Sequence, residues 1–199
     1  MTGPDAETLA VYSARASDYS EIHHGDVAQS VLTAFIGALP PGGSALDLGC
    51  GPGWGAAAMR DAELSVTAMD ACPEMAEVAR ARYGLTVRVG SFDDLDFQAA
   101  FDGVWASFCL LHAPRAALPR HLSAIHRALR PGGRVMVAMK LGTGEARDSI
   151  GRLYTYVTRD ELCGLLGDAG FAPEAEVTEP SVGFDGTPCD VIFLTARRD

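Results

Sequence analysis

The sequence predicts an α/β fold in which helices cover a mainly parallel β-sheet. From about residue 26 onward, apolar runs typical of strands alternate with segments of helical periodicity. The glycine-rich stretch "LDLGCGPGWG" at 46–55 follows the first strand-like run, which is where sheets of this class bind ligands. No repeat, linker or low-complexity segment interrupts the alternation. We therefore expect one domain that spans residues 1–199.

The first half of the chain predicts three helices and three strands. Asp26 can cap a helix that "PPGG" at 40–43 ends, and Pro73 is typical of a helix start. The apolar face of the first of these helices carries Leu32, Phe35, Ile36 and Leu39. The elements expected after that helix are a strand at 44–49, a helix at 53–60, a strand at 64–70, a helix at 73–83 and a strand at 85–90.

The second half continues the alternation. A strand is expected at 101–108, and a helix follows whose apolar spacing turns its charged residues toward water. Its buried face carries Leu118, Leu122, Ile125 and Leu129, and its water face carries Arg120, His121, Arg127 and Arg130, with His126 also solvated. "RPGG" ends this helix before a strand at 134–140. Thr158 and Glu161 predict a capping box for a helix that closes at Gly170. Strands at 171–178 and 190–197 could then pair as a terminal hairpin.

Composition narrows the class of partner. The net charge is −10 and lysine and arginine do not cluster, which argues against nucleic-acid and anionic-membrane binding and favours a small-molecule substrate. The five cysteines are scattered without a C-x-x-C pair, and His23 and His24 lack further ligands, so we expect neither a disulfide framework nor a metal site. The polar start and the lack of a long apolar run indicate a cytoplasmic protein.

The glycine-rich loop leaves more than one cofactor open. Gly51, Gly53 and Ala56 satisfy the dinucleotide pattern, so an NAD-dependent oxidoreductase is one alternative. Asp47, however, places an acid where a pyrophosphate would lie and where a cation would be favoured. Asp70 ends the second strand, where a carboxylate can accept hydrogen bonds from both hydroxyls of a ribose. A ribose joined to a cationic, phosphate-free part suggests S-adenosylmethionine. A loop that serves packing alone is a further alternative.

With these features the sequence resembles the class I S-adenosylmethionine-dependent methyltransferases over residues 9–197. The pieces that match are "LDLGCGPGWG", "VTAMDACPEM", "FDGVWASFCLLHAPR" and "LRPGGRVMVAMK", in that order. "LLHAPR" and "YTYVTRDELCGLLGDAGF" resemble a bacterial subgroup described as tellurite-resistance-related. The resemblance implies a Rossmann-like, doubly wound, seven-stranded, mainly parallel sheet with an antiparallel last strand and helices on both faces. It also implies methyl transfer to a small molecule by in-line displacement, with S-adenosylhomocysteine as product.

The resemblance also assigns cofactor-binding residues. Asp47 and the loop glycines, Gly49, Gly51 and Gly53, would hold the methionine portion, and Asp70 would hold the ribose. The adenine would lie between Ala71 and Met75, with Ser91 and Phe92 at its edge, and Ala106 and Leu111 would touch the methionine chain and methyl group. Residues 1–25 would form a lid-like segment whose Tyr12 and Tyr19 close over the cofactor. Serine is a weaker acceptor than the acid usual at its position, so the adenine contact would pass from Ser91 to Asp93 or to water.

His112 is the candidate catalytic base because it follows the fourth strand on the ligand side of the sheet. A bond to a loop carbonyl is its structural alternative. Arg115 could pair with an anionic substrate or with an acid such as Asp94 or Asp102. The short segment 141–157 favours a small acceptor, and Arg147, Arg152, Tyr154 and Tyr156 could line a pocket for a planar or anionic molecule. We expect a monomer or homodimer, and a non-catalytic S-adenosylmethionine-binding module remains an alternative.

Overall fold

The computed structural model describes residues 3–22 and 25–199 and contains one seven-stranded sheet in the order β3-β2-β1-β4-β5-β9-β8. Parallel pairing joins β1 to β2 and β4, while β9 runs antiparallel to both β5 and β8. The strands are β1 (Ser44–Leu48), β2 (Ser65–Asp70), β3 (Val87–Val89), β4 (Phe101–Ser107), β5 (Leu129–Lys140), β8 (Phe171–Val182) and β9 (Pro188–Arg198). The predicted doubly wound sheet with an antiparallel last strand is confirmed.

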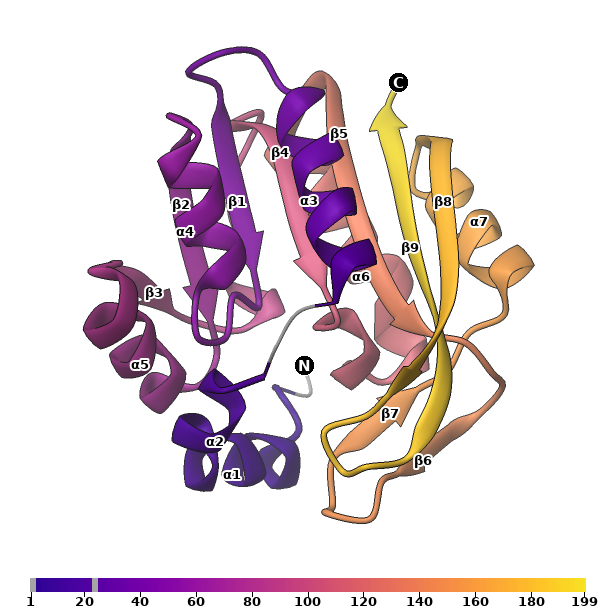
Figure 1. Cartoon of the computed structure of the whole chain (residues 1–199). Helices are drawn as coiled ribbons and strands as arrows, with labels where there is room; N and C mark the ends of the chain where they lie inside the picture. Colours follow the sequence, from indigo (N-terminus) through magenta and orange to yellow (C-terminus); the bar gives the residue numbers. More distant parts are fainter. Residues whose placement is uncertain (1–2, 23–24) are drawn as a thin grey trace.

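Helices cover both faces of this sheet (Figure 1). The helices are α1 (Ala6–Ala14), α2 (Ala16–Ser20), α3 (Asp26–Gly37), α4 (Trp54–Asp61), α5 (Pro73–Tyr83), α6 (Leu118–Ala128) and α7 (Arg159–Asp168). Alternate residues of β5 divide the core between the two faces. Met136 and Ala138 pack with α3, whereas Val135 and Val137 pack on the side of α6 and α7.

The carboxyl ends of the parallel strands form the functional edge of the sheet. The chain leaves β1 for β2 and β3 on one side and returns to β4 on the other, so the strand order reverses beside β1. Such a reversal opens a crevice for ligands in α/β sheets. In Figure 1 the arrowheads of β1 and β4 point toward α1 and α2, which lie across this edge.

Two hairpins border the same edge. The segment predicted as a short insertion folds as β6 (Glu145–Arg147) and β7 (Leu153–Thr155), an antiparallel pair outside the main sheet. The predicted terminal hairpin is present as β8 and β9, and both strands extend further than the apolar runs indicated. Figure 1 shows the connecting end of this hairpin beside β6 and β7.

Several local predictions need correction. Gly25, not Asp26, is the N-cap of α3, and Asp26 is the first helical residue. The strand predicted at 134–140 begins at Leu129, because Leu129 already pairs with Phe101 before a register shift that absorbs "RPGG". Thr158 accepts a bond from the Glu161 amide, but the Glu161 side chain turns away to another partner.

Among the helices built from described residues, none is both long enough and apolar enough to cross a bilayer.

Candidate functional site

A cavity of about 320 Å³ lies at the carboxyl edge of the sheet. Its walls come from the loop after β1, the end of β2, the segment after β4, the N-terminal helices and the β8–β9 hairpin. The predicted residues that line it are Tyr12, Tyr19, Gly49, Gly51, Asp70, Ala71, Met75, Ser91, Phe92, Leu111 and His112. Three other predicted residues, Asp47, Gly53 and Ala106, do not line it.

Close approach requires glycine in the loop after β1. Gly49 has a φ of 67°, and a Cβ built on it would stand 2.3 Å from the Cβ of Cys109. Gly53 is the N-cap of α4 with a φ of 90°, and its Cβ would stand 2.6 Å from a methyl carbon of Leu85. Glycine is the residue that adopts a positive φ without steric cost. The loop therefore lies directly against its neighbours, which brings the backbone of Gly51 to the cavity surface.

Asp70 joins the loop to the end of β2. One carboxylate oxygen accepts from the Gly51 amide at 2.7 Å, and the other accepts from the Cys72 amide at 2.8 Å. Burial raises the pKa of Asp70, while these amide bonds act in the opposite direction. A carboxylate oxygen can accept more than one hydrogen bond, so Asp70 keeps acceptor capacity toward the cavity that it lines.

Asp47 lies beneath the glycine loop and not in the cavity wall. Its side chain is buried at 3% exposure, and it accepts a hydrogen bond from the Ala56 amide near the start of α4. One of its oxygens is 3.0 Å from where a Cβ on Gly55 would stand, so Gly55 leaves room for the carboxyl group. Burial and the neighbouring Asp70 charge raise the pKa of Asp47 to about 7. Asp47 would therefore not touch a ligand in the cavity, and its effect on the ligand would be electrostatic, across the glycine loop.

The loop after β3 forms another wall of the cavity. Ser91 donates to Asp94 at 2.9 Å and caps a short 3-10 turn, so its hydroxyl is already engaged. Asp93 also lines the cavity and pairs with Arg120. His121 stacks against Phe92 with the ring centroids 5.2 Å apart. We expected His121 to face water, but its neighbours on α6 pack it against this loop at 5% exposure.

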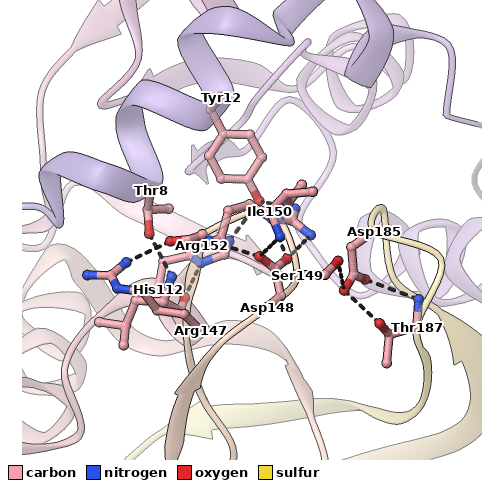
Figure 2. A network of polar contacts seen from close by, with 12 residues as sticks. Thr8, Tyr12, His112, Arg147, Asp148, Ser149, Ile150, Arg152, Asp185 and Thr187 are labelled. Atoms are coloured by element: carbon pink, nitrogen blue, oxygen red, sulfur yellow. Dashed lines mark hydrogen bonds and ion pairs between the residues drawn. The ribbon is translucent and has the colours of Figure 1, made fainter.

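His112 lies at the centre of a chain of hydrogen bonds that joins three segments (Figure 2). Its Nδ1 lies 2.7 Å from the Leu153 carbonyl oxygen, and because a carbonyl only accepts, Nδ1 carries the proton. The unprotonated Nε2 then accepts from the Tyr12 hydroxyl at 2.8 Å. The Tyr12 oxygen accepts in turn from Arg152 at 3.0 Å. Burial lowers the pKa of His112 to about 4, so the ring is neutral at physiological pH.

Arg152 holds this chain in place from the β6–β7 hairpin. It is buried at 1% exposure, and its Nε donates to Asp148 at 2.8 Å. Its guanidinium also lies over the ring of Tyr12, 5.3 Å from the centroid. Arg152 and Asp148 form an ion pair in which both side chains are almost wholly buried, so the charge of Arg152 is neutralised within the protein. Arg152 therefore positions the tyrosine and does not line the cavity.

A second set of contacts fixes the N-terminal segment on the same hairpin. Both carboxylate oxygens of Asp5 accept from Arg147 at 2.9 Å, and one of them also caps α1 by accepting from the Thr8 amide at 2.8 Å. The Thr8 hydroxyl accepts from the Leu153 amide at 2.8 Å. Tyr12 and Tyr19 meet edge to face with centroids 5.2 Å apart. The segment that was predicted to be lid-like therefore lies across the cavity in this structure.

Other predicted residues have different partners. Arg115 pairs with Glu161 and donates to the Tyr156 carbonyl oxygen, so it neutralises neither Asp94 nor Asp102. Of the four residues in the 141–157 segment that were expected to line a pocket, Tyr154 lines the cavity and Arg147, Arg152 and Tyr156 do not.

Lys140 lines the cavity and was not singled out from the sequence. It is the only lysine of the chain, and it ends a strand at the ligand edge of the sheet. A single lysine at the carboxyl end of a predicted strand is the sequence feature that could have indicated a role for Lys140 in the site.

The described residues contain no group of three or more histidine, cysteine and acidic side chains that could hold a metal ion. His23 and His24 lie outside the described residues.

Comparison with known proteins adds a family match. Residues 45–133 match a family model described as a methyltransferase domain. An uncharacterized 37.1 kDa protein in a transposon of Streptomyces fradiae is 30% identical over 87% of this chain and 56% of its own length. An O-methyltransferase of Pyrenophora dematioidea is 33% identical over 66% of this chain and 55% of its own length. The chain thus spans little more than half the length of these two relatives.

A solved structure covers nearly the whole chain. Burkholderia thailandensis 1,6-didemethyltoxoflavin-N1-methyltransferase, with 1,6-didemethyltoxoflavin and S-adenosylhomocysteine bound, has a TM-score of 0.77 to this structure and is 26% identical. The similarity covers 97% of this chain and 88% of that chain. S-adenosylmethionine-dependent methyltransferases of Methanosarcina mazei, at 18% identity and a TM-score of 0.73, share the fold.

Proposed function

We propose that the chain is a class I S-adenosylmethionine-dependent methyltransferase that transfers a methyl group from S-adenosylmethionine to a small-molecule acceptor; the match to a methyltransferase-domain model over residues 45–133 and the structural similarity to a methyltransferase with S-adenosylhomocysteine bound support this. The observation that carries this proposal is the charge of the wall formed by the glycine loop and Asp70. Asp70 lies in this wall and Asp47 lies beneath the loop behind it, and no arginine or lysine of the described residues lines the wall. Such a wall disfavours a pyrophosphate and favours a nucleoside that carries positive charge.

The residues present fit this cofactor. Asp70 has acceptor capacity for ribose hydroxyls, and the exposed backbone of Gly49 and Gly51 can meet the methionine portion. We propose that Asp47 and Gly53 act from below, the acid by its charge and the glycine by allowing the turn into α4. In the same proposal, Ala71 and Met75 flank the adenine, Ser91 and Phe92 meet its edge, and Leu111 reaches the methyl end. Ala106 lies behind that end of β4.

The cofactor, when bound, supplies a methyl group on a sulfonium that leaves readily in an in-line displacement. The protein then needs chiefly to orient the acceptor and to exclude water. We propose that the N-terminal segment excludes water, because Tyr12 and Tyr19 line the cavity, Arg152 of the β6–β7 segment bonds Tyr12, and Tyr19 packs edge to face on Tyr12.

We retain His112 as the proposed base, with a condition set by its geometry. Its Nε2 already accepts the Tyr12 proton at 2.8 Å, and the ring is a weak base because burial lowers its pKa to about 4. A proton from an acceptor could therefore reach Nε2 only if the Tyr12 hydroxyl moves aside or relays it. An acceptor that arrives already ionised would need no base at all.

Finer assignments rest on the sequence. We propose that the chain belongs near the tellurite-resistance-related subgroup because of "LLHAPR" and the residues that follow β6. The strongly acidic composition supports a small substrate over nucleic acid or membrane. A cytoplasmic location, one domain over residues 1–199 and a monomeric or homodimeric state are proposed on the same basis.

Titration calorimetry with S-adenosylhomocysteine and with NAD tests the cofactor. We expect S-adenosylhomocysteine to bind and NAD not to bind. Asp70→Asn should weaken that binding by about tenfold to a hundredfold, the scale of one or two hydrogen bonds to a charged group. Asp61→Asn, an exposed carboxyl change on α4, is the matched control and should bind like the wild type. Binding of NAD alone would establish the oxidoreductase alternative.

Methyl transfer is tested by incubating labelled S-adenosylmethionine with panels of small thiols, oxyanions, amines and phenols. Transfer to at least one class is expected. Tight cofactor binding with no transfer to any class would favour the non-catalytic module over an enzyme.

A further inference from the structure

Lys140 is a buried cation at the part of the cavity remote from the glycine loop. It ends β5, which is separated from β1 by β4, and its side chain is 7% exposed. Among the described arginines and lysines, it alone lines the cavity. Burying an ammonium group away from water is unfavourable unless an anion or other electron-rich group compensates it. The identity of that compensating group bears on what the cavity binds.

The two arginines of the neighbouring β6–β7 segment have carboxylate partners. Arg147 lies 2.9 Å from Asp5, and Arg152 lies 2.7 Å from Asp148. Each of these cations is therefore neutralised within the protein. Lys140 differs, because no carboxylate oxygen of the described residues lies within 4.0 Å of its Nζ.

The contacts of Lys140 leave its charge directed at the cavity. Its Nζ lies 4.0 Å from the ring centroid of Tyr154, a cation–π contact with a residue that also lines the cavity. The charge of Lys140 contributes to lowering the pKa of Asp185, so this carboxylate compensates it in part, but the hydrogen bonds of Asp185 come from Thr187 at 2.6 Å and Ser149 at 3.2 Å and not from Lys140 (Figure 2). Glu179 also lines the cavity and does not pair with Lys140. The ammonium group thus lies against the Tyr154 ring, and none of its hydrogen bonds goes to a residue within 3–22 or 25–199.

Aromatic side chains line this part of the cavity beside Lys140. Phe108 and Phe193 meet edge to face with centroids 5.3 Å apart, and both line it. The His112 ring lies 4.8 Å from that of Tyr154. Aromatic walls of this kind suit a planar molecule. A planar molecule with an anionic oxygen would satisfy Lys140 and the rings together.

We propose that Lys140 is the anchor for a carboxylate or similar anionic oxygen group on a small planar methyl acceptor. This proposal rests on the proposed function, because it names the class of acceptor for the same cavity. It assigns Lys140 a binding role, with the acceptor's anion directed toward β5 and its methylated atom toward the loop that holds the cofactor.

The test compares matched probes in the presence of saturating S-adenosylhomocysteine. The probes are the three positional isomers of hydroxybenzoate and the three corresponding hydroxybenzamides, which keep the ring and hydroxyl but lack the charge. We expect at least one benzoate to bind the wild type about tenfold more tightly than its amide, the scale of one hydrogen bond to a charged group. Lys140→Met should abolish that preference, and Lys140→Arg should keep part of it.

Two further variants separate the local charge from the overall charge. Arg127→Met removes one exposed positive charge just before β5 begins, at the opposite edge of the sheet, and should leave the preference unchanged. Asp185→Asn removes an acid that interacts with the charge of Lys140 and should tighten benzoate binding without affecting the amide. Because the chain has one lysine, protein labelled with ¹³C-lysine gives a single side-chain signal, which should shift with the benzoate and not with the amide.

The outcomes are distinguishable. If S-adenosylhomocysteine does not bind the wild type, the proposed function fails. If it binds the wild type and the Lys140 variants alike, but no benzoate is preferred over its amide, the Lys140 proposal is wrong. A preference that survives in Lys140→Met also overturns it, and places the anion at another group.

Discussion

The carboxyl group beneath the glycine loop makes cofactor affinity depend on pH in a predictable way. Burial and the charge of Asp70 raise the pKa of Asp47 to about 7. The ammonium group of S-adenosylhomocysteine favours the ionised form of this acid, so affinity should increase as pH rises through 7. The perturbation is therefore a pH series from 6 to 8, repeated with Asp47→Asn, which cannot ionise.

The size of the effect follows from that pKa. About a tenth of Asp47 is ionised at pH 6 and about nine-tenths at pH 8. If the ligand ammonium interacts with the ionised form alone, affinity should rise by at most about tenfold over this range, or about 1.4 kcal/mol. His112 does not add to this change, because burial lowers its pKa to about 4.

Calorimetry with two ligands isolates the contribution of Asp47. S-adenosylhomocysteine carries the ammonium group, whereas adenosine shares the ribose and base and lacks the charge. Titration of Asp70 would affect both ligands, so the ratio of the two affinities reports on Asp47. We expect the ratio to rise toward pH 8 in the wild type and to stay flat in Asp47→Asn.

The same pKa predicts a stability change of the opposite sign. Between about pH 4 and 7 the folded protein keeps a proton on Asp47 that the unfolded chain has lost, so stability decreases as pH rises through this window. The loss is at most about 4 kcal/mol, and Asp47→Asn should not show it. An affinity ratio that is flat in the wild type, or one that still rises in the asparagine variant, would refute the charge argument.

Three further predictions concern the loop and the N-terminal segment. Gly49→Ala should lower the free energy of unfolding in urea clearly more than Gly42→Ala. Both glycines have a φ of 67°, but the new Cβ would stand 2.3 Å from the Cβ of Cys109 at position 49 and in open space at position 42. Equal losses of stability would contradict the packing argument. Tyr12→Phe leaves a buried ring nitrogen without its 2.8 Å donor and should reduce stability by about 1–3 kcal/mol in thermal unfolding, whereas an unchanged Tm would show that this bond contributes nothing. Asp5→Ala removes a helix cap and an arginine partner, so amide exchange in α1 should accelerate while exchange in β4 stays the same; uniform acceleration would indicate global destabilisation.

The contacts that hold the N-terminal segment explain how a short chain can enclose a cavity. Arg152 bonds Tyr12 across 140 positions of sequence, and the Thr8 hydroxyl accepts from the Leu153 amide. Both contacts join α1 to the small hairpin after β5. The hairpin therefore serves as the support on which the segment rests, in addition to bordering the cavity.

Much of the fold could be predicted because it depends on local patterns. Apolar spacing and the proline and glycine positions predicted α5 at its observed bounds and the alternation of strands and helices along the chain. Such prediction failed at Leu129, where a long-range pairing with Phe101 extends β5 through a sequence that looks like a turn. It also failed at His121. The helical spacing predicted that His121 faces water, but Phe92 in the loop after β3 packs against its ring and His121 is buried.

The sequence by itself determined the glycine loop and the acid at the end of β2, on which the proposed cofactor rests, since backbone freedom and strand position follow from residue type and order. Only the tertiary structure decided which charges are neutralised inside the protein. An arginine side chain is long enough to reach several acids, so its partner depends on which segments pack beside it. In the folded chain Arg115 pairs with Glu161, and Arg152 pairs with Asp148. The same packing left Lys140 facing the cavity with no carboxylate oxygen of the described residues within 4.0 Å, which no local pattern of residues could reveal.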